Sequence, residues 1–182
     1  LGSPAPGSLA RVAAARPSDD VDLSLADHAC LAIIGEGPVH GWAIVKLLAP
    51  GAELGRIWSL SRPLTYRSIE RLVVAGLVTR SETGRRAVLT LTPAGRRRRT
   101  AWLDRPVDHL RELRTEFLLK LALRDRAELP RRPFVDDQLE RIGPAVTALT
   151  ATGPADPVER WRRESAIAAR RFLVALADDP LS

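Results

Sequence analysis

Apolar positions recur at intervals of three and four residues in the first part of the chain, which predicts helices at about residues 24–34, 41–49 and 61–75. Ser24 followed by Asp27 resembles a capping box, so we expect the first helix to begin there. Gly76 supplies the residue that commonly follows the end of a helix. Residues 1–20 are instead rich in Ala, Gly, Pro and Ser, which is typical of a flexible tail.

After Gly76 the pattern changes to the alternation that indicates β-strands. Strands are expected at residues 77–81 and 87–91, joined by a polar turn at 81–84. Thr92 and Pro93 then provide an N-cap and a first-turn proline for another helix. Helix, helix, helix, hairpin and helix is the order of elements in a winged helix. We therefore expect a mainly α fold with a small β-hairpin, in which residues 21–104 form a winged helix-turn-helix domain.

Apolar stripes after residue 100 predict amphipathic helices, separated by segments that contain proline and glycine. A few such helices have a thin core when alone, and they often bury their stripes against a second copy. We therefore expect residues 105–182 to form an all-helical dimerisation domain, which is also a candidate domain for binding an effector. The residues expected at the dimer interface are Leu139, Ile142, Val146, Leu149, Trp161, Phe172 and Leu176.

The net charge of +6, from 28 Lys and Arg against 22 Asp and Glu, is concentrated in one part of the chain. Residues 21–100 hold 12 basic and 6 acidic side chains, whereas residues 101–182 hold 14 of each. A basic segment beside a neutral one indicates that the first binds a polyanion and the second does not.

Several classes of protein are disfavoured by the residues present. A single cysteine excludes an internal disulfide framework, and Cys30 on the apolar first helix is expected to be a buried structural thiol. The histidines lack metal-ligand spacing and no nucleophile–base pattern stands out, so we expect no enzyme, no metal and no other cofactor. No segment is long and apolar enough for a membrane span and no secretory signal is evident, so we expect a cytoplasmic protein.

The third predicted helix and the hairpin carry the residues expected to bind double-stranded DNA. The second helix of a helix-turn-helix pair enters the major groove, where arginine binds guanine or phosphate and hydroxyl groups bind phosphate. The expected contacts are Arg62, Tyr66, Arg67, Ser68 and Arg71 from the helix, and Arg80, Arg85 and Arg86 from the hairpin. Four arginines at 96–99 either hold phosphate or lie on a solvated helix, and both alternatives remain open.

Several ordered motifs within residues 23–126 resemble the PadR family of bacterial transcriptional regulators. They lie at 31–42 (LAIIGEGPVHGW), 57–59 (IWS), 75–78 (AGLV), 91–95 (LTPAG), 101–103 (AWL) and 110–120 (LRELRTEFLLK). The long C-terminal helices are similar to those of the subgroup with the larger C-terminal domain.

This resemblance implies a homodimer built by the C-terminal helices, and repression that is relieved by a small molecule. It implies that Tyr66 contacts the DNA backbone and that His40 opens the second helix near it, and it places Thr65 in the same DNA-binding motif. The family often has Gly-Thr-Leu-Tyr where this chain has Pro63-Leu64-Thr65-Tyr66. Leu64 therefore replaces a hydroxyl group expected at the DNA.

Four aromatic residues are candidates for binding a small aromatic or hydrophobic effector: Trp58, Trp102, Phe117 and Trp161. Trp58 and Trp102 are expected at the seam between the winged helix and the C-terminal part. For each of the four, simple packing in a core or a dimer interface is the alternative.

The main hypothesis is a dimeric repressor that binds a pseudo-palindromic operator and is released by a small-molecule ligand. In one alternative, the basic face of the winged helix binds an acidic protein partner, and DNA affinity is absent even at low salt. In another, the chain sequesters a small molecule and has lost specific DNA binding.

Overall fold

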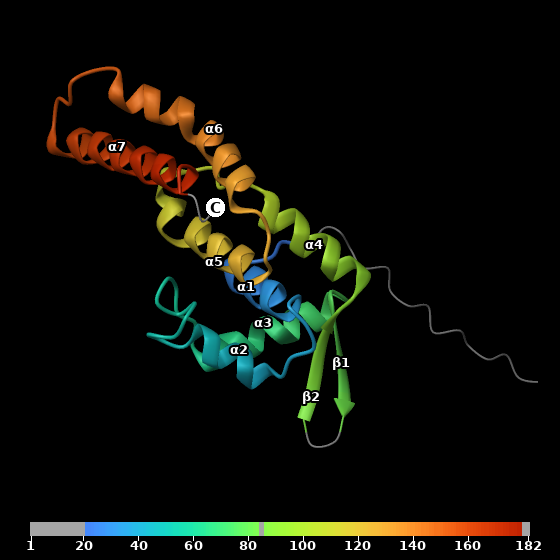
Figure 1. The fold of residues 1–182 in the computed structure, drawn as a ribbon. Coiled ribbons are helices and arrows are strands. Elements are labelled where there is room, and N and C mark those ends of the chain that lie inside the picture. The colour runs from blue at the N-terminus through green and yellow to red at the C-terminus, as the bar shows by residue number, and fades with distance from the viewer. Residues whose placement is uncertain (1–20, 84–85, 180–182) are drawn as a thin grey trace, which may run out of the picture.

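The computed structural model describes residues 21–83 and 86–179, including all of their side chains except those of 82, 83 and 86. The elements follow in the order α1 (Leu25–Ile34), α2 (Gly41–Leu48), α3 (Arg62–Val74), β1 (Val78–Thr83), β2 (Arg86–Leu91), α4 (Pro93–Asp104), α5 (Leu118–Arg126), α6 (Arg131–Thr150) and α7 (Pro157–Ala177). A 3₁₀ turn at Leu110–Glu112 and a π turn at Leu113–Phe117 lead into α5. The order from α1 to α4 confirms the predicted winged helix (Figure 1).

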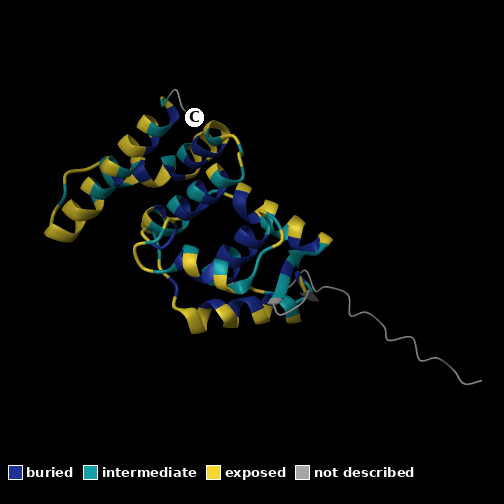
Figure 2. Ribbon diagram, turned by 60° about the horizontal axis from the view of Figure 1, so that its bottom comes forward, coloured by how far each residue is buried: buried dark blue, intermediate teal, exposed yellow. Residues whose placement is uncertain are grey.

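Helix α1 lies inside the N-terminal part of the fold and is buried along most of its length (Figure 2). The predicted capping box is present, because the Asp27 N–H donates to Ser24 Oγ over 3.3 Å and the Asp27 carboxylate accepts from the Ser24 N–H over 2.9 Å. Helices α2, α3, α4 and α5 and strand β2 all contact α1. Cys30 is fully buried there, as predicted, and burial raises the pKa of its thiol to about 12.

Strands β1 and β2 pair antiparallel and extend further toward the turn than the sequence predicts. Glu82 and Thr83, expected in the turn, belong to β1. These residues carry no apolar alternation, so only the backbone pairing reveals the strand there. Val39, just before α2, adds to the other edge of β2 through its N–H to the Leu89 carbonyl at 3.2 Å and the reverse bond at 2.8 Å.

The start of α4 joins the end of the hairpin to the end of α3. Thr92 caps α4 as predicted, because its hydroxyl accepts from the Gly95 N–H over 3.0 Å. The same hydroxyl donates to the Gly76 carbonyl over 2.8 Å, and Gly76 has the expected positive φ of 70°. A Cβ at position 95 would lie 2.0 Å from the Leu77 carbonyl oxygen, so only glycine permits this close approach.

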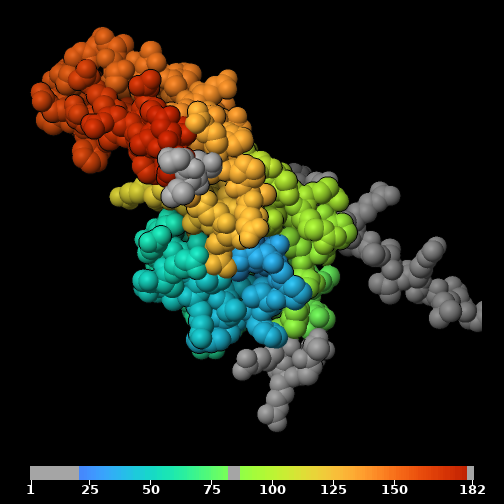
Figure 3. All heavy atoms as spheres, in the orientation of Figure 1, coloured from blue at the N-terminus to red at the C-terminus, as the bar shows by residue number. Residues whose placement is uncertain are grey.

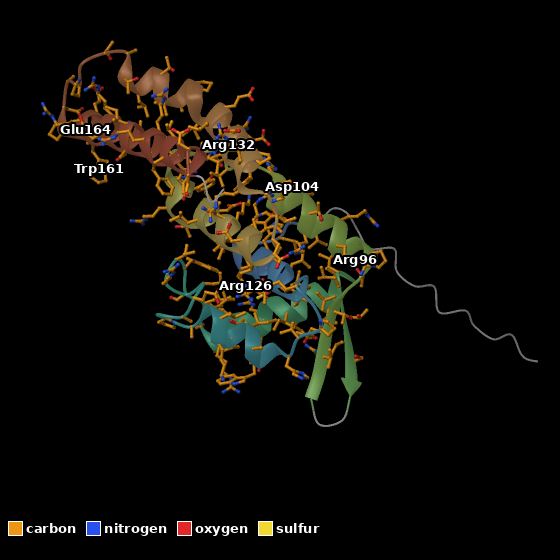
Figure 4. All side chains as sticks on the ribbon, in the orientation of Figure 1. Arg96, Asp104, Arg126, Arg132, Trp161 and Glu164 are labelled. Carbon is orange, nitrogen blue, oxygen red and sulfur yellow. The ribbon has the colours of Figure 1, made fainter. Side chains whose placement is uncertain are left out.

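Helices α6 and α7 form a hairpin that projects from the rest of the molecule (Figure 3). Arg132 of α6 donates to the Ala177 carbonyl at the end of α7, which fixes that end of the hairpin (Figure 4). The fold has two apolar cores, the first inside the winged helix and the second beneath α6 and α7. Helix α5 connects the hairpin to the winged helix, because Leu119 and Leu123 pack in the first core and Leu121 packs in the second. Within the described ranges, none of the helices combines the length and apolarity that a bilayer crossing requires.

The hairpin corrects part of the predicted dimer interface. Ile142 and Val146 are 1% and 6% exposed, because α7 of the same chain covers them. Leu139, Leu149 and Leu176 pack partly against the same core. The apolar stripe on α6 is therefore covered by α7 of the same chain. Sequence periodicity shows that such a stripe is buried, but not whether the same chain or a second copy covers it. Trp161 and Phe172 keep larger exposed areas, 73% and 41%.

Candidate nucleic-acid interface

Helix α3 packs against α1 and α2 through an inward stripe and leaves its other side in solvent. The stripe consists of Thr65, Ser68, Ile69 and Leu72, which recur at helical spacing. The β1–β2 hairpin lies next to α3 (Figure 1), and the exposed Glu70 of α3 pairs with Arg80 of β1. The exposed side of α3 and the hairpin are the two elements that a winged helix presents to DNA.

This packing shows that the prediction for Thr65 and Ser68 was wrong. Thr65 is fully buried and its hydroxyl donates to the Ser61 carbonyl over 3.1 Å, while Ser68 is 5% exposed. The hydroxyl of Thr65 is satisfied inside its own helix, so its burial leaves no polar group unpaired. Hydroxyl residues are mostly exposed in proteins, so Ser68 was expected on the outer side of the helix, and the family resemblance had suggested Thr65.

At the start of α3 an arginine lies against two exposed aromatic rings. The guanidinium carbon of Arg62 is 5.5 Å from the ring centroid of Trp42 and 5.8 Å from that of Tyr66. The rings belong to residues that are 49% and 40% exposed. Arg62 and Tyr66 are thus on the surface, as predicted. Sequence reasoning missed Trp42, because the packing of α2 on α3 decides which side of α2 faces outward.

The remaining arginines of α3 and β1 have contrasting surroundings. Arg67 is exposed, and its guanidinium forms no ion pair or hydrogen bond with any other residue that the structure describes. Arg71, in contrast, lies 3.0 Å from the fully buried carboxylate of Asp27. Arg80 pairs with Glu70 at 2.8 Å. Of these three cations, Arg67 is the one left to bind an external group.

The wing itself is only partly described. Arg85 lies outside the described residues, and so does the side chain of Arg86. His40 joins the wing to the helix pair, because its Nδ1 donates to the Ala87 carbonyl over 2.9 Å. His40 therefore stands at the junction of α2 and β2, where one of its ring nitrogens has an intramolecular role.

Three of the four arginines at 96–99 bind carbonyl groups of the chain. Arg96 donates to Leu91 over 3.0 Å, Arg98 to Val21 over 2.8 Å, and Arg99 to Ala32 over 3.2 Å. Desolvation lowers the pKa of Arg99. These contacts join α4 to α1 and to the segments that precede α1 and α4, a role that neither sequence alternative included.

The four predicted effector residues do not share one pocket. Trp58 lines a hollow of about 750 Å³ between the loop before α3 and helix α5, together with Arg56, Arg114 and Leu118. Trp102 lines a separate, polar pocket of about 280 Å³. Trp161 lines an apolar hollow of about 680 Å³ beside α7. Phe117 is fully buried and stacks on Phe134, so it belongs to the second core.

Trp102 anchors a partly buried polar cluster between the winged helix and the C-terminal part. Its indole N–H donates to Glu116 over 3.0 Å, and the Lys120 ammonium lies 2.8 Å from the same carboxylate. Burial lowers the pKa of Lys120. The ring of His28 stacks on Trp102 with centroids 4.9 Å apart, and burial lowers the pKa of His28 to about 4. No sequence signal connected these four residues.

A second polar contact ties α5 to the loops of the winged helix. Arg126, labelled in Figure 4, lies 2.6 Å from a carboxylate oxygen of Glu36 and 2.9 Å from one of Glu53. Glu36 follows α1 and Glu53 follows α2, so one guanidinium holds both loops to the end of α5. The hydrogen bonds to Glu36 are the main reason why the pKa of Arg126 is raised.

Comparison with known proteins yields structural similarity only. No protein-family model matches the chain, and no curated protein matches it. Similar solved structures include that of Bacillus subtilis PadR in complex with operator DNA, with 20% identity and a TM-score of 0.45 over 85% of this chain and 98% of that one. The Vibrio cholerae virulence activator AphA is similar at 26% identity and TM-score 0.41, over 85% and 92% of the two chains. The PadR-like transcriptional regulator BC1756 from Bacillus cereus has 15% identity and TM-score 0.41, over 84% and 92%.

Proposed function

We propose that the chain is a sequence-specific DNA-binding transcriptional regulator that places α3 in the major groove and its hairpin on the flanking backbone. The observation that carries this proposal is the outward side of α3. It presents Arg67 without an intramolecular partner among the described residues, next to Arg62 on its aromatic support. Arginine on such a helix binds the O6 and N7 atoms of guanine or a phosphate.

The charge distribution supports the same proposal. The excess of basic residues lies in 21–100, although Arg71, Arg80, Arg96, Arg98 and Arg99 are partly used inside the chain. The number of free cations on the DNA side is therefore small. We expect a moderate salt dependence, and a larger contribution from base contacts than the net charge suggests.

The test begins with selection of preferred duplexes from a random-sequence DNA pool by the full chain. Fluorescence anisotropy then compares a preferred duplex with a scrambled one of equal composition at several salt concentrations. We expect Arg67→Ala to weaken the preferred duplex by about 5- to 100-fold and the scrambled one far less. Arg170→Ala replaces an exposed arginine of α7 and serves as the matched control. Equal, salt-sensitive binding to both duplexes by the unaltered chain contradicts sequence-specific recognition. No binding to either duplex, even at low salt, favours an acidic protein partner.

We further propose that the regulator acts as a homodimer on a pseudo-palindromic operator. Two recognition helices about 34 Å apart match successive major grooves, and a dimer supplies that spacing. Trp161 projects from α7 at its exposed side, beside the apolar hollow that also includes Phe172 (Figure 4). Sedimentation analysis tests whether the chain forms a dimer in solution. Trp161→Ala is expected to weaken the dimer, whereas Val74→Ala, at an 81% exposed site on α3, leaves it unchanged.

The effector proposal is that a small aromatic or hydrophobic molecule binds in the hollow at Trp58 and releases the repressor from DNA. The hollow lies between the loop that precedes α3 and the helix that leads to α6, so a ligand there contacts both parts of the chain. A screen of small aromatic compounds by tryptophan fluorescence, with Trp58→Phe as the control variant, tests the site. Tight ligand binding by a chain without a preferred DNA sequence favours the sequestering alternative.

A further inference from the structure

The exposed surface at the start of α3 is apolar where a DNA-binding helix usually carries polar groups. Leu64 is 49% exposed, so about half of its apolar side chain faces solvent. The neighbouring hydroxyl of Thr65 points inward and bonds to Ser61. At this level of the helix, Leu64 therefore presents a branched apolar side chain to solvent.

Leu64 stands at the part of the helix that meets base edges. It is the third residue of α3, and the N-terminal residues of a recognition helix are the ones that contact bases in the major groove. It lies three residues before Arg67, on the same side of the helix. Arg62, in contrast, lies against the rings of Trp42 and Tyr66, which orders its side chain at that position.

The chemistry of the major groove limits what a leucine favours there. Guanine, adenine and cytosine present hydrogen-bonding atoms, and a leucine that covers them displaces water without replacing its bonds. Thymine presents a C5-methyl group, which is apolar and protrudes into the groove. Contact between that methyl and an exposed leucine removes apolar surface of both from water.

We propose that Leu64 selects a thymine in each half-site through its C5-methyl group, adjacent to a guanine bound by Arg67. This inference rests on the proposed function, since it assigns the base preference of the same helix. Leu64 is then a specificity-determining residue, and each operator half-site is predicted to carry a thymine next to a guanine.

The test replaces each thymine of the selected duplex, one at a time, with deoxyuridine, which removes only the methyl group. Anisotropy titrations measure the affinity ratio between the thymine and deoxyuridine duplexes. For the unaltered chain we expect one thymine per half-site at which this ratio is about 3 to 5, the effect of burying one methyl group. In Leu64→Ala the ratio at that position is expected to fall to about 1, because the apolar partner is gone.

Matched variants keep the result interpretable. Val74→Ala shortens another exposed apolar side chain, at the far end of α3. In this variant the affinity ratio between the thymine and deoxyuridine duplexes is expected to equal that of the unaltered chain. Alanine favours helix, and circular dichroism of both variants verifies that α3 is intact. A preferred duplex that is indifferent to methyl removal, or an unchanged ratio in Leu64→Ala, overturns this inference alone. Selection that yields no preferred sequence overturns the proposed function, and this inference with it.

Discussion

Arg67 and Arg71 lie four residues apart on α3, yet the structure predicts opposite consequences when each is replaced by alanine. Arg67 has no partner among the described residues, so Arg67→Ala is expected to change the free energy of unfolding by less than about 0.5 kcal/mol while weakening DNA binding. Arg71 is paired with Asp27 of α1, so Arg71→Ala is expected to destabilise the fold.

The size of that destabilisation follows from the burial of the two partners. The Asp27 carboxylate is fully buried and lies 3.0 Å from Arg71, whose side chain is 48% exposed. Arg71 also donates to the Asp22 carbonyl over 3.2 Å. Removing a charged donor from a buried acceptor costs about 1.5–3 kcal/mol, and the exposure of Arg71 favours the lower end. For a chain of this length the melting temperature falls by about 3–6 °C.

Urea and thermal unfolding followed by circular dichroism measure the stability, and anisotropy on the selected duplex measures the affinity. The double variant Asp27→Ala/Arg71→Ala is the control, because its loss is expected to be smaller than the sum of the two single losses. The reasoning is refuted when Arg71→Ala unfolds like the unaltered chain, or when Arg67→Ala is the less stable variant of the two.

Three further predictions concern the packing around α1 and α4. Gly95→Ala forces a Cβ against the Leu77 carbonyl and is expected to destabilise the fold by about 1–3 kcal/mol in urea unfolding, whereas Gly143→Ala, in open space on α6, is expected to be neutral or stabilising. The folded-state pKa of His28, about 4, lies below the ordinary value of 6.5, so the unfolded chain binds more protons between these values. Stability is therefore expected to fall as the pH drops from about 6.5 toward 4, and His28→Gln should flatten this slope. The Cys30 thiol, with its pKa of about 12, is expected to resist alkylation at neutral pH until urea unfolds the chain, and rapid alkylation of the folded chain contradicts the burial.

The local elements of the winged helix were predictable because their signals are short in range. Ser24 and Asp27 cap α1, Thr92 caps α4, and Gly76 follows α3, as each pattern predicts. Hydrogen bonds between residues three apart set these boundaries, so the neighbours along the chain contain the necessary information.

The fate of individual arginines was not predictable from the chain alone. Arg67 and Arg71 have the same chemistry and the same local pattern, and only the position of α1 relative to α3 gives Arg71 its partner in Asp27. The run at 96–99 shows the same effect, because its three bonded carbonyls come from segments as distant as residue 21.

The sequence by itself determined the order of the elements of the winged helix, the caps of α1 and α4, the burial of Cys30 and the concentration of positive charge in residues 21–100, because each depends on composition or on neighbours along the chain. The tertiary structure alone decided that Thr65 and Ser68 face inward, that α7 covers the stripe on α6, and that three tryptophans line separate hollows. The physical reason is that amphipathic periodicity states that a face is buried but not what covers it. The rotation of each helix and the choice of its partner are set by packing between residues far apart in the chain.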